Sequence, residues 1–115
     1  HSWVGVSGID VNSDIVDAMN LTVDRGFLIM NVIEDGPADQ AGLRAGDQNV
    51  TINDVRYRLG GDVIIGINDT EISGINHIHT YLAQKTRPGD SIVITVIRNG
   101  EKEEIPLTLG SRPQD

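Results

Sequence analysis

Two segments joined by Asn99-Gly100 constrain the fold of this chain more than any other feature. Residues 91–97 are rich in Ile and Val, and residues 104–109 alternate polar and apolar side chains. Asn-Gly between two such segments is the strongest short-range signal for a β-hairpin, because both residues tolerate the positive φ of a tight turn. The sequence therefore predicts that an antiparallel hairpin closes the fold.

Other β-type segments precede this hairpin. Residues 26–33 form a nearly continuous apolar run, and residues 63–67 form a second one before the turn at Asn68-Asp69. Short apolar runs of β-branched residues between turn signals indicate buried strands. Strands therefore outnumber helices, which favours an α+β fold: a partly open antiparallel β-barrel or sandwich with one long helix and one or two short ones.

The helices are expected between these strands. N-cap residues, Pro at the first helical position and Gly beyond the end mark their limits. We expect a short helix at 14–19 capped by Ser13 or Asp14, a short helix from Ala38 to Leu43 after Pro37 with Gly46 closing its exit, and a long helix at 74–86 capped by Ser73. In the long helix, one broad apolar side carries Ile75, Ile78, Tyr81 and Leu82.

Length and charge limit the function. The 115 residues suit a single domain, spanning 1–115, and no Cys is available for a disulfide or a thiolate metal site. The net charge is −8 and the basic residues are scattered, so we expect neither nucleic acid nor an anionic membrane as a partner. No apolar run approaches the roughly 20 residues of a membrane helix. His1 is not a natural start, which suggests a fragment, a processed chain or a tagged protein.

Two similar segments lie in the middle of the chain. Residues 46–54 resemble residues 61–69, fifteen positions later, and both begin with Gly-Asp. We interpret 61–69 as the main strand and 48–60 as an inserted β excursion. Because long surface insertions cost little closure entropy, we expect the excursion to be dispensable for folding. Residues 111–115 are expected to form a frayed tail.

Catalytic chemistry has no support in the sequence. The histidines are His1, His77 and His79, and the last two lie about 200° apart on one helix, so they cannot serve one site. No nucleophile motif around a Ser is present, and no group of ligands has metal-binding spacing. We therefore expect no catalytic residue, no metal and no cofactor, and interpret His79 as a partly packed side chain.

Several segments resemble the PDZ domains of HtrA/Deg serine proteases. Residues 3–6, Trp-Val-Gly-Val, are similar to the carboxylate-binding loop of that family. Residues 36–47 resemble its Pro-Ala…Ala-Gly-Leu…Gly-Asp signature, and 61–68 resemble its main strand. Residues 87–89 and 96–100 resemble its closing hairpin. The excursion at 48–60 departs from the pattern by separating a Gly-Asp from its strand.

The resemblance implies a peptide-binding module without catalytic machinery. Such domains capture the C-terminus of a peptide, or an unfolded segment, as an added strand between a sheet edge and the long helix. The residues implied for binding are Trp3, Val4, Gly5, Val6, Gly74, Ile78 and Tyr81. Ile75 and Leu82 are then expected to point at the core. Their Asp variants should differ accordingly: Ile78→Asp should leave the fold standing, and Leu82→Asp should unfold it.

The resemblance also sets the expected context. The parent protein would be a trypsin-like serine endopeptidase in protein quality control, in the periplasm or at the cell surface and tethered to a membrane. The domain would contact a protease domain in cis, and oligomers would form through that domain. The alternatives are a regulatory or structural domain with an occluded groove, or the PDZ domain of a membrane metalloprotease or a tail-specific protease.

Overall fold

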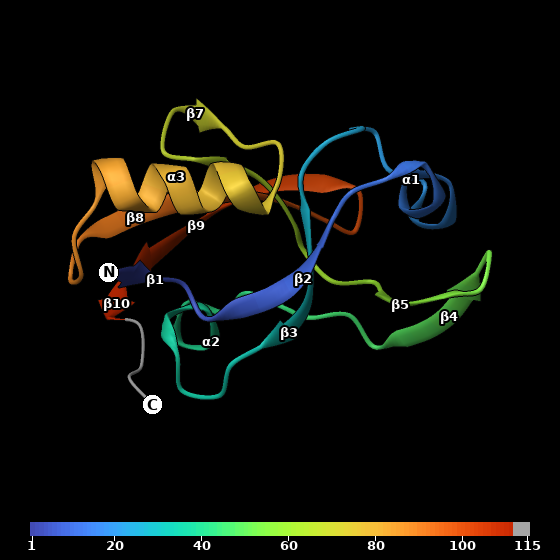
Figure 1. Ribbon diagram of the computed structural model, residues 1–115, viewed down its shortest axis with the longest axis horizontal. Coiled ribbons are helices and arrows are strands. Elements are labelled where there is room, and N and C mark those ends of the chain that lie inside the picture. Colours follow the sequence, from blue (N-terminus) through green and yellow to red (C-terminus); the bar gives the residue numbers. More distant parts are fainter. Residues whose placement is uncertain (112–115) are drawn as a thin grey trace.

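The computed structural model describes residues 1–111 and consists of β-strands with three helices at their margins (Figure 1). In chain order the elements are β1 Ser2–Trp3, β2 Val6–Asp10, α1 Ser13–Met19, β3 Phe27–Val32, α2 Pro37–Ala41, β4 Gln48–Ile52, β5 Val55–Leu59, β6 Val63–Ile67, β7 Thr70–Glu71, α3 Ile75–Lys85, β8 Ser91–Arg98, β9 Glu101–Thr108 and β10 Gly110–Ser111.

The main sheet is antiparallel and stays open. Its strand order is β2-β3-β6-β8-β9, with β7 also paired to β6, so β2 and β9 lie at the two edges. Two small ladders complete the β structure: β1 pairs with β10, and β4 pairs with β5. The α+β class expected from the sequence, with one long and two short helices, is confirmed.

The closing hairpin forms as the Asn-Gly signal predicts. Strands β8 and β9 pair in register from Ser91↔Thr108 to Arg98↔Glu101. Asn99 and Gly100 form the turn with φ of 53° and 80°. Positive φ at both positions is the geometry whose twist matches that of the flanking strands.

Strand β3 divides the interior into two apolar clusters. Phe27 and Ile29 point into a large cluster that also contains buried residues of α2, α3, β8 and β9. Leu28, between them, points the other way, into a smaller cluster with Ile15 and Ile97. This alternation is the period of two that a strand imposes, and both clusters are therefore fixed by one buried strand.

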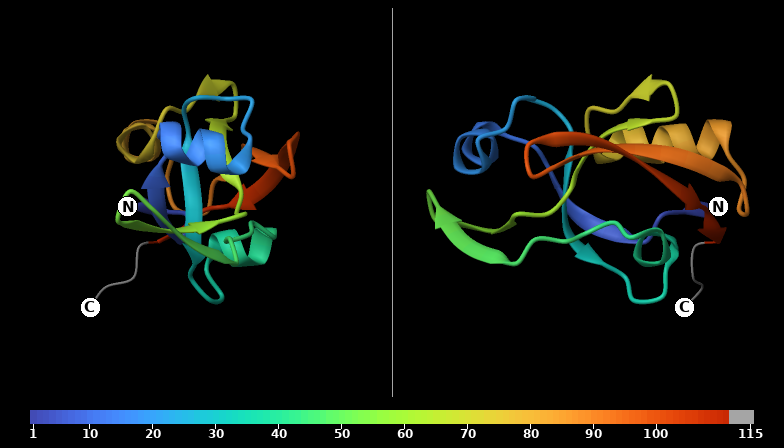
Figure 2. Two further views of the ribbon diagram at one scale, coloured as in Figure 1. Left: turned by 90° about the vertical axis from the view of Figure 1, so that its right-hand side faces the viewer. Right: turned by 180° about the vertical axis from the view of Figure 1, so that it is seen from behind.

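The segment at 48–60 is a hairpin that projects from one end of the molecule (Figure 2). Among the described residues its strands pair only with each other. The expectation of a mere surface excursion is wrong in one respect. Tyr57 and Leu59 are only 5% and 3% exposed. They lie on the same face of β5, and this face covers Ile15 and Leu28 and so completes the smaller cluster.

The Gly-Asp pairs that begin the two similar segments lie close together at the base of this hairpin. A Cβ on Gly61 would lie 2.6 Å from the Gly46 nitrogen, and a Cβ on Gly46 would lie 2.2 Å from the Leu59 carbonyl oxygen. Glycine is therefore required at both positions by the close approach of two backbones. The chain leaves and re-enters the fold at this crossing.

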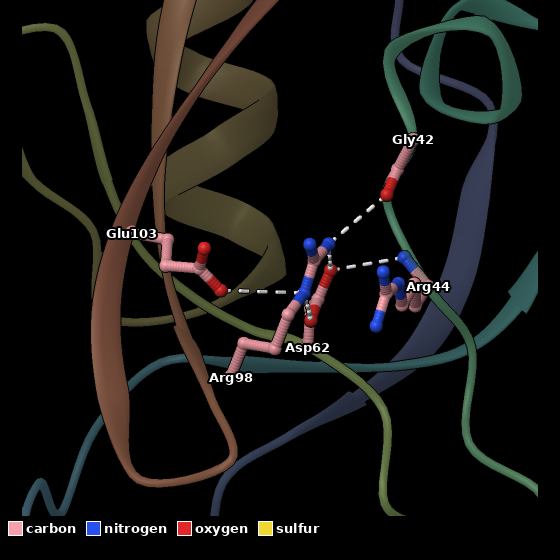
Figure 3. A network of polar contacts seen from close by, with 5 residues as sticks. All are labelled: Gly42, Arg44, Asp62, Arg98 and Glu103. Atoms are coloured by element: carbon pink, nitrogen blue, oxygen red, sulfur yellow. Dashed lines mark hydrogen bonds and ion pairs between the residues drawn. The ribbon is translucent and has the colours of Figure 1, made fainter.

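A buried ion pair secures the re-entry point (Figure 3). Asp62 accepts hydrogen bonds from Arg98 Nε at 2.8 Å and Nη2 at 2.6 Å, and from the Arg44 amide at 2.9 Å. Arg98 Nη2 also donates to the Gly42 carbonyl at 3.0 Å, and Glu103 lies 3.7 Å from Nε. The hydrogen bond to Asp62 raises the pKa of Arg98, against the opposing effect of burial. The pair joins β8 to the segment after α2.

Three local expectations need correction. Helix α1 is capped by Asn12, whose side chain accepts from the Ile15 amide, because Asn12 keeps the extended backbone that a cap requires. Helix α2 ends at Ala41, since Gly42 adopts a left-handed φ of 87° well before Gly46. Ser111 pairs with Ser2 in a ladder. The rest of the expected frayed tail, 112–115, lies outside the described residues.

Across residues 1–111, no helix has both the length and the apolar character needed to cross a membrane.

Candidate functional site

An open groove of about 400 Å³ runs between the N-terminal segment and helix α3. Its lining is mainly apolar, with two histidines and one serine. The lining residues are His1, Ser2, Trp3, Val4, Gly5, Val6, Ile75, Ile78, His79, Leu82 and Ala83. Such an elongated apolar space beside a strand is suited to an extended chain.

One wall of the groove is formed by residues 1–5 and by Val6, the first residue of the edge strand β2. Strand β2 pairs with β3 on one side and with no described strand on the other. An edge strand presents backbone N–H and C=O groups that a further strand can pair with. Helix α3 forms the opposite wall, where Ile75, Ile78, Leu82 and their neighbours follow a helical spacing along one face. A single added strand would therefore contact backbone on one side and apolar side chains on the other.

The loop before β2 leaves backbone donors unused. The Val4 carbonyl accepts from the Ala38 amide at 2.8 Å, and the Gly5 carbonyl accepts from the Ile33 amide at 2.9 Å. The amides of Val4 and Gly5 donate no hydrogen bond to any residue within 1–111. The two carbonyls are therefore held by the fold, whereas the two amides have no partner among the described residues and belong to residues that line the groove.

Gly5 is required by this loop geometry. Its φ is +85°, in the left-handed region that favours glycine. The Trp3 ring supports the turn from behind, because a Cβ on Gly5 or on Gly36 would each lie 3.4 Å from Trp3 Cη2. Trp3 itself is fixed by pairing with Gly110 in the β1–β10 ladder. The loop is therefore held in shape before any ligand arrives.

Hydrogen bonds join the two walls at each end of the groove. At the loop end, the hydroxyl groups of Ser2 and Thr86 are hydrogen-bonded at 2.9 Å, with Thr86 Oγ1 also donating to the Leu82 carbonyl at 2.7 Å. At the far end, the Ile75 amide donates to Asp10 Oδ1 at 2.8 Å. Asp10 ends β2 and Ile75 begins α3, so the strand and the helix run in opposite directions along the groove.

The structure places five of the seven expected binding residues along the groove: Trp3, Val4, Gly5, Val6 and Ile78. Gly74 instead precedes α3, where it faces the Asp10 carboxyl group. Tyr81 points to the other side of the helix and accepts a hydrogen bond from Asn68 Nδ2 at 3.0 Å. Neither residue is among those that line this groove, and their role in binding stays a prediction.

The division of α3 into a groove side and a core side is wrong. Ile78 and Leu82 are 3% and 6% exposed, so both belong to the core, and both also border the groove. Ile75 is half-buried and lines the groove as well. The expected contrast between Ile78→Asp and Leu82→Asp therefore loses its basis, because either charge would be buried.

Sequence reasoning missed His79 and Ala83 as groove residues. Both are exposed and line the groove, and they lie four and eight positions after Ile75 on the same helix face. That spacing was the available signal. His77 lies elsewhere: its Nδ1 accepts from the Ser73 amide at 3.3 Å. No group of three or more His, Asp or Glu able to hold a metal occurs within the described part of the chain.

The expectation that Ser73 caps α3 is wrong as well. Gly74 occupies the cap position and makes no side-chain hydrogen bond. The cap comes instead from Asp10, which lies 65 residues before Ile75 and accepts a hydrogen bond from the Ile75 amide, the first of the helix. A carboxylate at this position also interacts favourably with the positive end of the helix dipole.

Comparison with known proteins agrees with this geometry. The family model described as PDZ domain matches residues 4–109. The chain therefore belongs to the PDZ domain family.

Relatives of greater length are similar to the whole chain. Proteins named probable periplasmic serine endoprotease DegP-like match all 115 residues, with 32% identity in Hahella chejuensis and 30% in Bartonella henselae. The chain spans only 21% and 20% of the length of these two relatives. The resemblance to the PDZ domains of HtrA/Deg proteases is confirmed by these matches.

Solved structures agree on the fold. A structure described as HtrA-type protease AlgW with decapeptide superposes with a TM-score of 0.71 and 29% identity, over 99% of this chain and 30% of that one. The HtrA3 PDZ domain bound to a phage-derived ligand, FGRWV, gives a TM-score of 0.66 over 96% of this chain and 89% of that one. At 14% identity, that second match shows the fold alone.

Proposed function

We propose that the groove captures the C-terminal end of an extended peptide, which adds to β2 as a strand. The observation that carries this proposal is the pair of free amides, on Val4 and Gly5, at one end of an apolar groove beside an unpaired sheet edge. Free amides facing a groove suit a carboxylate, and the sheet edge suits the backbone that precedes it.

The apolar lining defines the expected ligand. Val4, Val6 and Leu82 lie near the loop end, and their surfaces suit an aliphatic or small apolar side chain at the last position of the ligand. Burying such a side chain contributes about 1.5–3 kcal/mol. Hydrogen bonds to a charged acceptor contribute about 1.5–3 kcal/mol more. After the cost of ordering the peptide, we expect micromolar affinity, or about −8 kcal/mol.

Peptide complexes of similar proteins support this reading. The AlgW structures are described with a decapeptide and with a tripeptide, and the sequences of these proteins are 29% identical to this chain. Each matches this chain over 99% of its length. We infer that the same kind of ligand, an extended peptide, is the natural occupant of the groove here.

The wider role follows from the longer relatives. We propose that the chain is the non-catalytic, peptide-binding part of a serine endopeptidase, located outside the cytoplasm, which the names of the relatives support. It would tether substrates or regulate a protease domain in cis. Membrane tethering, oligomers formed through the protease domain and a role in protein quality control belong to the same proposal. The isolated domain should not cleave an unfolded substrate such as casein.

Comparison of free-acid and amidated peptides tests the function. Fluorescence polarisation would measure the affinity of an octapeptide ending in Val with a free carboxylate and of the same peptide ending in a carboxamide. We expect amidation to weaken binding about tenfold or more, because it removes the charged acceptor. Equal affinities would refute carboxylate capture and favour a domain whose groove is occluded.

A further inference from the structure

Asp10 joins the two walls of the groove at the end opposite to the carboxylate loop. It is the last residue of β2, and its Oδ1 accepts the first amide of α3, at Ile75. Asp10 is exposed, and its second oxygen, Oδ2, accepts no hydrogen bond from any residue in 1–111. One oxygen therefore holds the helix in place while the other is available to a ligand.

The residue next to this contact shows how closely the helix approaches Asp10. Gly74 has an extended backbone that any residue could adopt, with φ of 170°. A Cβ at this position would nevertheless lie 2.7 Å from the Asp10 carboxyl carbon. The contact therefore depends on Gly74, and it holds the carboxylate beside Ile75, which lines the groove.

The direction of β2 determines which part of a ligand passes Asp10. A peptide whose carboxylate is bound by the Val4–Gly5 amides and which pairs antiparallel with β2 runs past the whole strand, Val6–Asp10. Strands advance about 3.3 Å per residue, so successive ligand residues lie opposite successive residues of β2. With the last ligand residue opposite Val6, about the fourth or fifth residue from the ligand C-terminus lies beside Asp10.

We propose that Asp10 is a specificity-determining residue, which selects ligands with Lys or Arg at the fourth or fifth position from the C-terminus. This inference rests on the proposed strand addition and deepens it. The positive end of α3 offsets only about half a charge, so the carboxylate keeps net negative character. Acidic side chains at the same ligand positions are disfavoured by repulsion.

The size of the effect follows from the exposure of Asp10. Ion pairs at such exposed sites are weak, and we expect Lys to improve affinity about two- to fivefold over Gln. Glu should be weaker than Gln by a similar factor. Because the charges are accessible to solvent, these differences should shrink as salt is raised from about 0.05 M to 0.5 M.

The variant Asp10→Asn separates charge from structure. The Asn side-chain oxygen can still accept from the Ile75 amide, so the cap is preserved while the negative charge is removed. Glu104→Gln serves as the matched control, since Glu104 is an exposed carboxylate on β9, at the opposite edge of the sheet. Circular dichroism and thermal unfolding would establish that both variants keep the wild-type fold.

The experiment titrates free-acid octapeptides ending in Val and carrying Lys, Gln or Glu at the fourth or fifth position from the C-terminus. We expect wild type and Glu104→Gln to rank them Lys, Gln, Glu, and Asp10→Asn to bind all three alike. Equal binding of the three by wild type, or an unchanged ranking in Asp10→Asn, would overturn the role of Asp10 and leave carboxylate capture standing. Absence of binding by every free-acid peptide would overturn both proposals.

Discussion

The two sides of strand β3 are built differently. On the hairpin side, Leu28 is covered by α1 and by Tyr57 and Leu59 of β5. On the groove side, Phe27 and Ile29 are also buried, but beyond them an open groove remains between β2 and α3. The hairpin side has an apolar cluster covered by β5, whereas on the groove side the residues within 1–111 leave one edge of β2 and the amides of Val4 and Gly5 without a partner.

This difference separates stability from binding. Filling a space with side chains stabilises the folded chain, whereas a free edge adds nothing until a ligand pairs with it. Substitutions at the hairpin and at its base should therefore change the free energy of unfolding and leave peptide affinity nearly constant. Substitutions of exposed groove residues should do the reverse.

Loss of Asp62 should have the largest effect on stability. Asp62→Ala leaves Arg98, whose side chain is 15% exposed, without the closer of its two ion-pair partners and leaves the Arg44 amide without its acceptor. Removing one member of a buried pair costs about 3–5 kcal/mol. Urea unfolding followed by circular dichroism measures the loss. In the control, Glu103→Ala, the loss should stay below about 1 kcal/mol, because Glu103 is exposed. Similar losses for both variants would contradict the central place given to Asp62.

Truncation in the hairpin should come next. Leu59→Ala should reduce the free energy of unfolding by about 2–4 kcal/mol, because it opens a cavity in the smaller cluster. Val55→Ala, at the 49% exposed start of the same strand, should change it by less than about 0.5 kcal/mol. Replacing the whole hairpin by a short Gly/Ser link should cost at least as much as Leu59→Ala. A loss near zero would restore the view that the hairpin is dispensable.

Gly5 should affect stability and binding together. Gly5→Ala places a side chain at φ +85°, and Gly42→Ala does so at φ +87°, so both should lose about 1–2 kcal/mol of stability. Only Gly5 lies in the loop that borders the groove, and its variant alone should weaken binding of a free-acid peptide, by about tenfold. Fluorescence polarisation and urea unfolding on both variants make the comparison. Equal affinities for the two variants would show that the loop does not bind the ligand.

A charge in the groove should have the smallest effect. Ala83→Glu places a carboxylate on the groove face of α3, and Gln84→Glu places one on the next residue, which does not line the groove. We expect Ala83→Glu alone to weaken binding of the free-acid peptide, by about two- to fivefold, through repulsion between exposed charges. Unfolding free energies should be the same for the two variants. An equal loss of affinity in both would indicate a general effect of charge.

Local signals in the sequence predicted much of the fold. The Asn99-Gly100 hairpin and the strand at Phe27–Val32 depend on neighbouring residues, and both formed as expected. The loop at Val4 and Gly5 was predictable because a glycine with positive φ and its flanking apolar residues form a contiguous motif. Signals of this kind need no knowledge of distant parts of the chain.

Contacts between distant segments could not be predicted in the same way. The cap of α3 comes from Asp10, and no local pattern connects that residue with Ile75. The burial of Tyr57 depends on where the hairpin folds back, which its alternating sequence leaves open. Tyr81 shares the apolar side of α3, yet its hydroxyl group accepts from Asn68 and places it outside the groove. Periodicity defines a face of a helix, but the packing decides which part of that face borders the groove.

The most direct test of carboxylate capture follows individual backbone amides on adding a peptide. Amide resonances of the domain, recorded by ¹H–¹⁵N NMR, would be titrated with a free-acid octapeptide ending in Val and with its amidated form. We predict that the free acid shifts the Val4 and Gly5 amides most, shifts residues of β2 and α3 less, and leaves the hairpin at 48–60 unchanged, while the amidated peptide causes much smaller shifts at Val4 and Gly5. Shifts of equal size for both peptides, or shifts confined to the hairpin, would contradict the account.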